Sequence, residues 1–150
     1  MLLIIRNERM LLEMIQDTEK QFPEHLVFFM LHHLHHPERT SLFHQIEERL
    51  STTGQGIQPL FSELYRVRRQ RLRIIIRMTE SYLLEIQSSM IMRDYLASIW
   101  SLTYGAAVIL NSSFYQRYLG SRDTLRVAYI DQALAMPKQH QQFTSSLMTQ

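Results

Sequence analysis

Histidine is the residue type most concentrated along this chain and the one that first points to metal chemistry. Six of the seven histidines lie between residues 25 and 44: His25, His32, His33, His35, His36 and His44. A helix places His32 and His36 on one face, with His25 on that face two turns earlier, and paired imidazoles can chelate a divalent metal. The pattern lacks both the glutamate of an HExxH motif and an obvious third ligand. Hydrogen-bonded or exposed histidines are the favoured interpretation, and a metal-binding helical protein is the alternative.

Two arginines stand where a helix over residues 59–87 is otherwise apolar. Arg68 and Arg71 fall among its apolar positions, while the solvated opposite side gathers four others: Arg66, Arg69, Arg73 and Arg77. An unpaired buried charge is very costly, so these two guanidinium groups need a carboxylate, an interface or a bound anion. We expect either an ion pair, with Glu47, Glu63 or Asp94 as partner, or a pocket arginine that receives an acidic or polar ligand.

The chain carries none of the short motifs that mark common catalytic sites. It has no GxSxG elbow, no phosphate-binding loop and no GxGxxG turn. Cysteine is absent, which excludes disulfides, thiolate metal sites and cysteine nucleophiles. We therefore expect a protein that is not an enzyme and that uses no cofactor.

Length and charge narrow the class further. A chain of 150 residues fits one domain, and a net charge of +2 is too small to indicate a nucleic-acid-binding surface. The opening MLLII is shorter than the apolar region of a secretory signal and far shorter than a membrane span. We expect a cytoplasmic protein with no membrane segment.

The spacing of chain breakers predicts the elements. Glycine and proline occur only four times each, and no segment alternates as a strand would, so we predict an all-α fold. It is expected to be an orthogonal bundle of about six helices, over residues 2–21, 23–36, 37–50, 59–87, 91–111 and 121–136. Ser121 can cap the last helix, and Pro137 is expected to end it. The predicted domain covers residues 1–136, and residues 137–150 are expected to form a polar tail.

The helix over residues 91–111 carries the clearest packing signal. Its segment YLASIWSLTYGAAVIL holds no charged residue, and Gly105, Ala106 and Ala107 would let another helix approach closely. Such a helix is either the centre of one domain or part of a two-fold interface, because obligate dimers bury apolar area as a domain core does. We expect a homodimer.

Three stretches of the chain resemble one known family. IIRNERMLLEMIQD, with Asn7, Glu8, Arg9 and Leu11, is similar to the junction that follows the DNA-binding region of TetR-family transcriptional repressors. PEHLVFFMLHHLHHPERTSLF, with its His36-Pro37-Glu38 turn, resembles that family's paired middle helices, and IMRDYLASIWSLTYGAAVIL its penultimate long helix. The likeness spans nearly the whole chain and is to the C-terminal regulatory part of the family.

The resemblance implies a ligand pocket and a dimer interface. By analogy, the pocket for a small apolar or anionic effector would be lined by Phe28, Met30, Leu31, Phe61, Tyr65, Arg68, Leu72, Trp100 and Tyr104. The last two long helices would form a four-helix dimer interface through Tyr95, Ile99, Leu102, Gly105, Ala106, Ile109, Leu125 and Tyr129. The family's helix-turn-helix would precede the first helix and is not present in these residues, so DNA would be reached only through that missing region.

The leading hypothesis is therefore an effector-binding, dimerising regulatory domain of a TetR-like repressor. A ligand that binds one arrangement of the helices more tightly would shift the dimer toward that arrangement. A helical protein–protein interaction module without a small-molecule site is the second hypothesis. It predicts a filled core in place of a cavity.

Overall fold

The computed structural model describes residues 1–53 and 57–139, and every regular element in them is a helix. The helices are α1 (Leu2–Ile15), α2 (Phe22–Leu34), α3 (Pro37–Thr53), α4 (Gln58–Glu85), α5 (Met92–Asn111), α6 (Ser113–Leu119) and α7 (Arg122–Gln139). The all-α prediction is confirmed. The count differs because residues 113–119, expected to be a few turns between helices, form the separate helix α6.

The ends of several helices differ from the prediction for local reasons. α1 ends at Ile15 instead of residue 21, and beyond it the Asp17 carboxylate accepts a hydrogen bond from the backbone of Glu19, as in a turn. α3 continues past residue 50 to Thr53, and hydroxyls of its last turn donate to the carbonyls of Glu48 and Arg49. The segment 51–59, predicted to be a loop between the third and fourth helices, is helical at both ends, over residues 51–53 and 58–59, and residues 54–56 lie outside the described part.

Serine side chains cap the first turns of α6 and α7, and a glycine lies between the two helices. The Ser112 hydroxyl accepts a hydrogen bond from the Tyr115 amide at the start of α6, and Ser121 accepts one from Thr124 at the start of α7. Gly120, between the two helices, has φ +120°, a backbone conformation that side-chain-bearing residues rarely adopt. The cap predicted at Ser121 is confirmed.

α7 does not stop at Pro137, as was predicted, but continues to Gln139 with the proline inside it. Proline has no N–H, so the carbonyl four residues earlier, that of Ala133, loses its helical partner. The Tyr95 hydroxyl, from α5, donates to the Ala133 oxygen at 2.8 Å and replaces the missing bond. Ser88 in turn donates to the Pro137 carbonyl at 2.6 Å. The proline is tolerated because neighbouring side chains satisfy the backbone around it. Of the predicted 137–150 tail, residues 140–150 lie outside the described part.

Removing the Tyr95 hydroxyl should therefore lower the free energy of unfolding more in this chain than in a variant without Pro137. We expect Tyr95→Phe to lower the free energy of unfolding by about 1–3 kcal/mol, because it leaves a buried carbonyl without a donor. In a Pro137→Ala background the new amide can bond to Ala133, so the same substitution should cost about 1 kcal/mol less. Urea unfolding of the wild type, the two single variants and the double variant measures both values. Equal costs in the two backgrounds would contradict this account.

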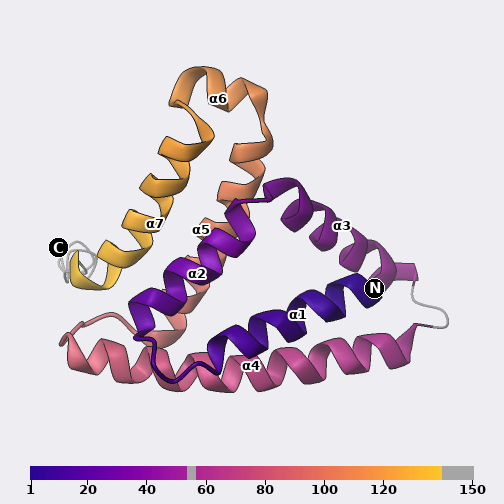
Figure 1. Ribbon diagram of the computed structural model, residues 1–150, viewed down its shortest axis with the longest axis horizontal. Coiled ribbons are helices and arrows are strands. Elements are labelled where there is room, and N and C mark those ends of the chain that lie inside the picture. The colour runs from indigo at the N-terminus through magenta and orange to yellow at the C-terminus, as the bar shows by residue number, and fades with distance from the viewer. Residues whose placement is uncertain (54–56, 140–150) are drawn as a thin grey trace, which may run out of the picture.

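The helices enclose two apolar cores that meet along α4. In Figure 1, α4 with α1 forms the base of a triangle, α2 and α5 form one side, and α3 closes the other. The larger core joins α2, α5, α7 and the end of α4 around Met30, Leu34, Tyr95 and Leu110. The smaller core joins α1 to the first half of α4 through Ile4, Ile5, Phe61 and Leu64, with α3 side chains against it.

The charged surfaces agree with the predicted pattern. The four arginines on the far side of α4 are all exposed: Arg66, Arg69, Arg73 and Arg77. The prediction of a solvated arginine face is confirmed. Across residues 1–53 and 57–139, no helix combines the length and hydropathy that a membrane crossing requires.

Candidate ligand-binding site

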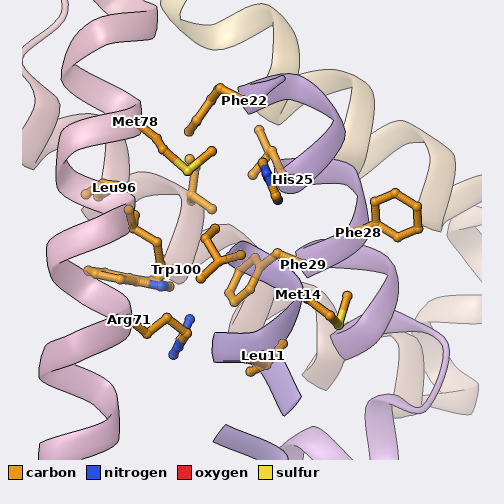
Figure 2. Close-up of a pocket in the computed structure, with 14 residues that line it drawn as sticks. Leu11, Met14, Phe22, His25, Phe28, Phe29, Arg71, Met78, Leu96 and Trp100 are labelled. Atoms are coloured by element: carbon orange, nitrogen blue, oxygen red, sulfur yellow. The ribbon is translucent and has the colours of Figure 1, made fainter. Parts of the chain in front are cut away.

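Three hollows lie in a row between the helices of the triangle. The first, here called the apolar cleft, is bordered by α1, α2, α4 and α5, and its lining includes Leu11, Phe29, Arg71, Ile75 and Trp100. Figure 2 shows Leu11, Phe29 and Trp100 converging between α2 and α4, with the Arg71 guanidinium next to the Trp100 indole. The cleft has a cavity volume of only about 50 Å³, which is far below the roughly 300 Å³ at which drug-sized pockets begin.

The other two hollows are larger and more polar. The central hollow, of about 310 Å³, is lined by Arg68, Arg71, Leu72, Ile75, Trp100 and Tyr104. The polar cavity, of about 240 Å³, is lined by Ile4, Asn7, Glu8, His32, His33, Arg39, Thr40, Phe43, His44, Glu47, Arg68 and Tyr104. The central hollow shares Trp100 with the apolar cleft and Tyr104 with the polar cavity, so the three hollows adjoin one another.

A cluster of four ionised side chains stands where these hollows meet. Arg68 donates from Nε to Glu8 at 2.9 Å and from Nη2 to Glu47 at 2.7 Å, and its Nη1 also bonds to Glu47. Arg71 donates to the second Glu8 oxygen at 3.1 Å. Burial alone would lower the pKa of Arg68, but the two carboxylates outweigh it and raise that pKa above its usual value. The cluster joins α1, α3 and α4.

The cluster supplies the carboxylate partners that Arg68 and Arg71 were expected to need. The expected ion pair of Arg68 with Glu47 is confirmed, whereas Glu63 pairs with Arg9 and Arg66 on the surface and Asp94 lies beside Arg93. Glu8, which is 5% exposed and accepts hydrogen bonds from both arginines, was not among the predicted partners. A signal was present, because Ile4, Ile5, Glu8, Leu11 and Leu12 follow helical spacing and all are buried.

His33 has one buried ring nitrogen without a partner. The Thr40 hydroxyl donates its single hydrogen to the His33 carbonyl at 2.8 Å, so it can only accept at its 3.2 Å contact with His33 Nδ1. Nδ1 therefore carries the ring proton, and Nε2 is a bare acceptor. Nε2 is fully buried and has no hydrogen-bond partner. Because most buried polar atoms are paired, this nitrogen needs an explanation.

His32 and Arg39 form the wall next to His33. Asn7 Oδ1 lies 2.7 Å from His32 Nε2, so the ring is the donor in that contact, and Arg39 donates to the His32 carbonyl at 2.8 Å. Burial and then the positive charges of Arg39 and Arg71 lower the pKa of His32 to about 4. Both effects keep the ring neutral, and the positive charges of Arg39 and Arg71 would also repel a metal cation there.

The histidines do not form the metal site considered above. His36 is largely exposed and faces Glu38, while His25 Nε2 contacts the Asp17 carbonyl at 3.0 Å. In the described ranges 1–53 and 57–139, no three His, Asp or Glu side chains are grouped so that they could hold a metal ion. The His32/His36 spacing is a consequence of helix geometry and brings no further ligand with it.

The buried neutral state of His33 predicts acid sensitivity. Burial, followed by the neighbouring His32 and the two arginines, lowers the pKa of His33 from 6.5 to about 3. Between pH 6.5 and about pH 3, His33 binds a proton in the unfolded chain but stays neutral in the folded chain. The free energy of unfolding is therefore highest above pH 6.5 and falls as the pH decreases to about 3. At pH 5 the loss is about 2 kcal/mol relative to pH 7. Urea unfolding at both pH values should show it, and His33→Gln should remove it. An unchanged pH dependence in the variant would contradict the assignment.

The predicted pocket residues divide between the hollows and the cores. Four of them line the central hollow: Arg68, Leu72, Trp100 and Tyr104. Phe28 borders the apolar cleft but is 42% exposed, and in Figure 2 its ring points away from the other labelled side chains. Met30 and Phe61 line none of the three hollows and are buried within the cores, at 0% and 5% exposure. Leu31 packs against the larger core, and Tyr65 lies against the Phe61 ring.

The predicted interface residues are mostly covered by the chain itself. Tyr95, Ile99 and Ala106 are at most 3% exposed, so in this arrangement of the chain their side chains present no surface to a second copy. Three others pack partly buried against the larger core: Leu102, Leu125 and Tyr129. Ile109 is also partly buried. Gly105 is exposed, and a Cβ added there would meet open space.

Comparison of the chain with models of known families, with curated proteins and with solved structures gave no match. The assignment of a function therefore depends on the geometry of the hollows and on the residues that line them.

Proposed function

We propose that the chain is the effector-binding and dimerising regulatory domain of a TetR-like repressor, with the effector held in the polar cavity and the central hollow. The observation that carries the proposal is the pair of adjoining hollows of about 240 and 310 Å³, which Arg68 and Tyr104 both line. Small-molecule sites are concave, with a few polar groups placed among apolar side chains, and these hollows have that composition.

The position of the resembling stretches supports the regulatory role. The three stretches fall on α1, on α2 with α3, and on α5, and these helices border the polar cavity. The Glu8–Arg68–Glu47 bridge connects three helices at the cavity wall. A ligand that competes for Arg68 would therefore bind best to an arrangement in which α3 is displaced from α4, and binding would shift the population toward that arrangement.

The proposed dimer surface is the one formed by α6 and its neighbours. Phe114, Tyr115 and Tyr118 form an exposed aromatic cluster on α6, and Tyr118 is 68% exposed. Val108 on α5 and Val127 on α7 are also exposed. Contiguous exposed apolar side chains mark association surfaces, and a two-fold contact would bring two copies of this cluster together. This surface replaces the buried α5 residues as the candidate interface.

The dimer is tested by light scattering at micromolar concentration. We expect twice the mass of one chain, and we expect Tyr118→Glu to give the single-chain mass because it places a charge in the aromatic cluster. Leu84→Glu is the matched control, since Leu84 is 79% exposed at the far end of α4. A wild-type monomer would refute the dimer proposal.

Effector binding is tested by thermal shift against a chemically diverse set of anionic, neutral and cationic small molecules. A compound that binds only the folded chain adds about 2.7 kcal/mol to the free energy of unfolding at a hundredfold excess over Kd. The melting temperature rises as a result. We expect hits whose effect is lost in Leu72→Trp, which fills the central hollow, and retained in Arg73→Trp on the exposed side of α4. The absence of any hit from all three classes would refute the effector role.

A further inference from the structure

The outer side of α4 carries three arginines that the chain itself leaves without partners, here called the arginine row. Arg69, Arg73 and Arg77 are exposed and follow one another at intervals of four residues, so they lie along one side of the helix about 6 Å apart. In Figure 1, α4 lies along the base of the triangle, and no helix is drawn below it. Within residues 1–53 and 57–139, none of the three forms an ion pair or a side-chain hydrogen bond.

Carboxylates stand only at the two ends of the arginine row. Glu63, before it, is already engaged, because Arg9 and Arg66 donate to its two oxygens. Glu80, one turn after Arg77, forms no ion pair in the part of the chain that the structure describes. The sequence between residues 64 and 79 contains no acidic residue. The net charge of +2 is a value for the whole chain, and the positive charge on this side of α4 is locally much denser.

The composition of this side favours a partner that is bound through charge alone. Between residues 66 and 77, every exposed side chain of α4 is an arginine or a glutamine. Protein partners need an apolar core of contacts, and membrane-surface helices insert apolar side chains beside their basic ones. Nucleic-acid backbones need neither, because arginine, glutamine and similar donors bind phosphate oxygens, and neutralising the phosphates supplies the affinity.

The arrangement favours a duplex over a single strand. Proteins that bind single strands add aromatic side chains on which the bases stack, and residues 66–77 include no aromatic residue. A duplex carries one negative charge per about 1.7 Å of its axis, so the arginine row, about 12 Å long, would face several phosphates at once.

We propose that the arginine row of α4 binds the phosphate backbone of duplex DNA without reading its sequence. Each of its three guanidinium groups donates to a phosphate, and Gln70 adds a neutral donor beside them. The choice of DNA over RNA rests on the repressor function proposed above, whereas the phosphate contact does not. In such a repressor, the contact would hold the regulatory domain against the DNA that the family's helix-turn-helix recognises.

Fluorescence anisotropy of a labelled 20-base-pair duplex, titrated with the whole chain, tests the proposal. We expect binding at 50 mM salt that weakens about fortyfold at 200 mM, because each of three phosphate contacts contributes about −0.9 to the salt slope. A second duplex of unrelated sequence should bind with a Kd within about twofold of the first, since phosphate contacts carry no sequence information. An affinity that does not depend on salt would overturn the proposal.

Substitutions locate the contact on α4. The triple glutamine variant of the arginine row should bind at least about thirtyfold more weakly, while the triple lysine variant should retain most of the affinity because a point charge suffices for phosphate. Glu80→Gln should strengthen binding about threefold by removing a carboxylate that repels the phosphates. The charge-matched control replaces three exposed arginines on other helices, Arg49, Arg117 and Arg122, by glutamine and should change the Kd by less than about threefold.

The outcomes separate this proposal from the function proposed above. Equal losses in the two triple glutamine variants, or no binding at 50 mM salt, would overturn the contact and leave the effector and dimer tests unaffected, since those use no nucleic acid. A preference for duplex RNA would overturn the choice of DNA. Equal or tighter binding of the matching single strand, of polyglutamate, or of vesicles of equal parts phosphatidylserine and phosphatidylcholine would overturn the duplex as the partner.

Discussion

Glu8→Gln is expected to lower the free energy of unfolding by about 3–5 kcal/mol, the cost of breaking a buried ion pair by removing one partner. Glu8 is buried and accepts hydrogen bonds from Arg68 and Arg71 through its two oxygens. Arg68 retains Glu47 after the substitution, but Arg71, which is 8% exposed, keeps no carboxylate partner among the described residues. Urea unfolding followed by circular dichroism at pH 7 measures the loss.

A control and a second substitution identify the source of that loss. Glu13→Gln, on the exposed side of the same helix, should change the stability by less than about 0.5 kcal/mol. Adding Arg71→Met to Glu8→Gln removes the stranded charge, so the double variant should be more stable than Glu8→Gln alone. A double variant that is less stable would show that Arg71 is held by something other than Glu8.

Met30→Ala is expected to lower the free energy of unfolding by about 2–5 kcal/mol, the range for truncating a large buried apolar side chain. Met30 is completely buried on α2 and belongs to the larger core with Leu34 and Tyr95. The resemblance to TetR regulators placed it in a ligand pocket, where truncation would instead enlarge the pocket at little cost in stability. The same urea titration decides between the two placements.

Phe28, two residues earlier, is the matched control for Met30. It is 42% exposed and its main partner is the Lys20 ammonium, 3.9 Å above the ring centre. Exposed cation–π contacts contribute little, so Phe28→Ala should cost about 1 kcal/mol or less. Similar losses for the two substitutions would mean that α2 does not turn Met30 inward.

The fold was predictable because few residues interrupt its helices. Prolines and the scarcity of glycine located most helix starts within a residue or two. The errors lie where tertiary contacts override local preference. Pro137 stays inside α7 because Tyr95 repairs the backbone, and Tyr95 is 38 residues away along the chain. The residues around Pro137 do not indicate a hydrogen-bond donor so far away in the sequence.

The candidate site was predictable only in part. Helical spacing identified Arg68 and Arg71 as misplaced charges and supplied Glu47 as a partner, but it could not rank a residue 60 positions away, Glu8, above nearer carboxylates. The importance of His33 was not visible either. It depends on which nitrogen Thr40 engages and on the burial of the other, and both are set only when α2 and α3 pack together.

The sequence also could not separate core residues from interface residues. The segment around Tyr95 and Ala106 is uncharged because α2 and α7 cover it, and composition alone does not separate a surface buried by the same chain from one buried by a second copy. The exposed aromatic cluster of α6 lies in residues that were expected to be a short connection. Because α6 has only seven residues, a search for long apolar helices does not find it.

The bond between Tyr95 and Ala133 gives the chain an internal optical reporter. A phenol that loses its acceptor changes its near-ultraviolet absorption, so an event that pulls α7 away from α5 changes the contribution of Tyr95. The chain holds seven tyrosines and one tryptophan, so this contribution is obtained as the difference between the spectra of the wild type and of Tyr95→Phe. Movement of the last helix during association or effector binding can thus be followed in solution from that difference.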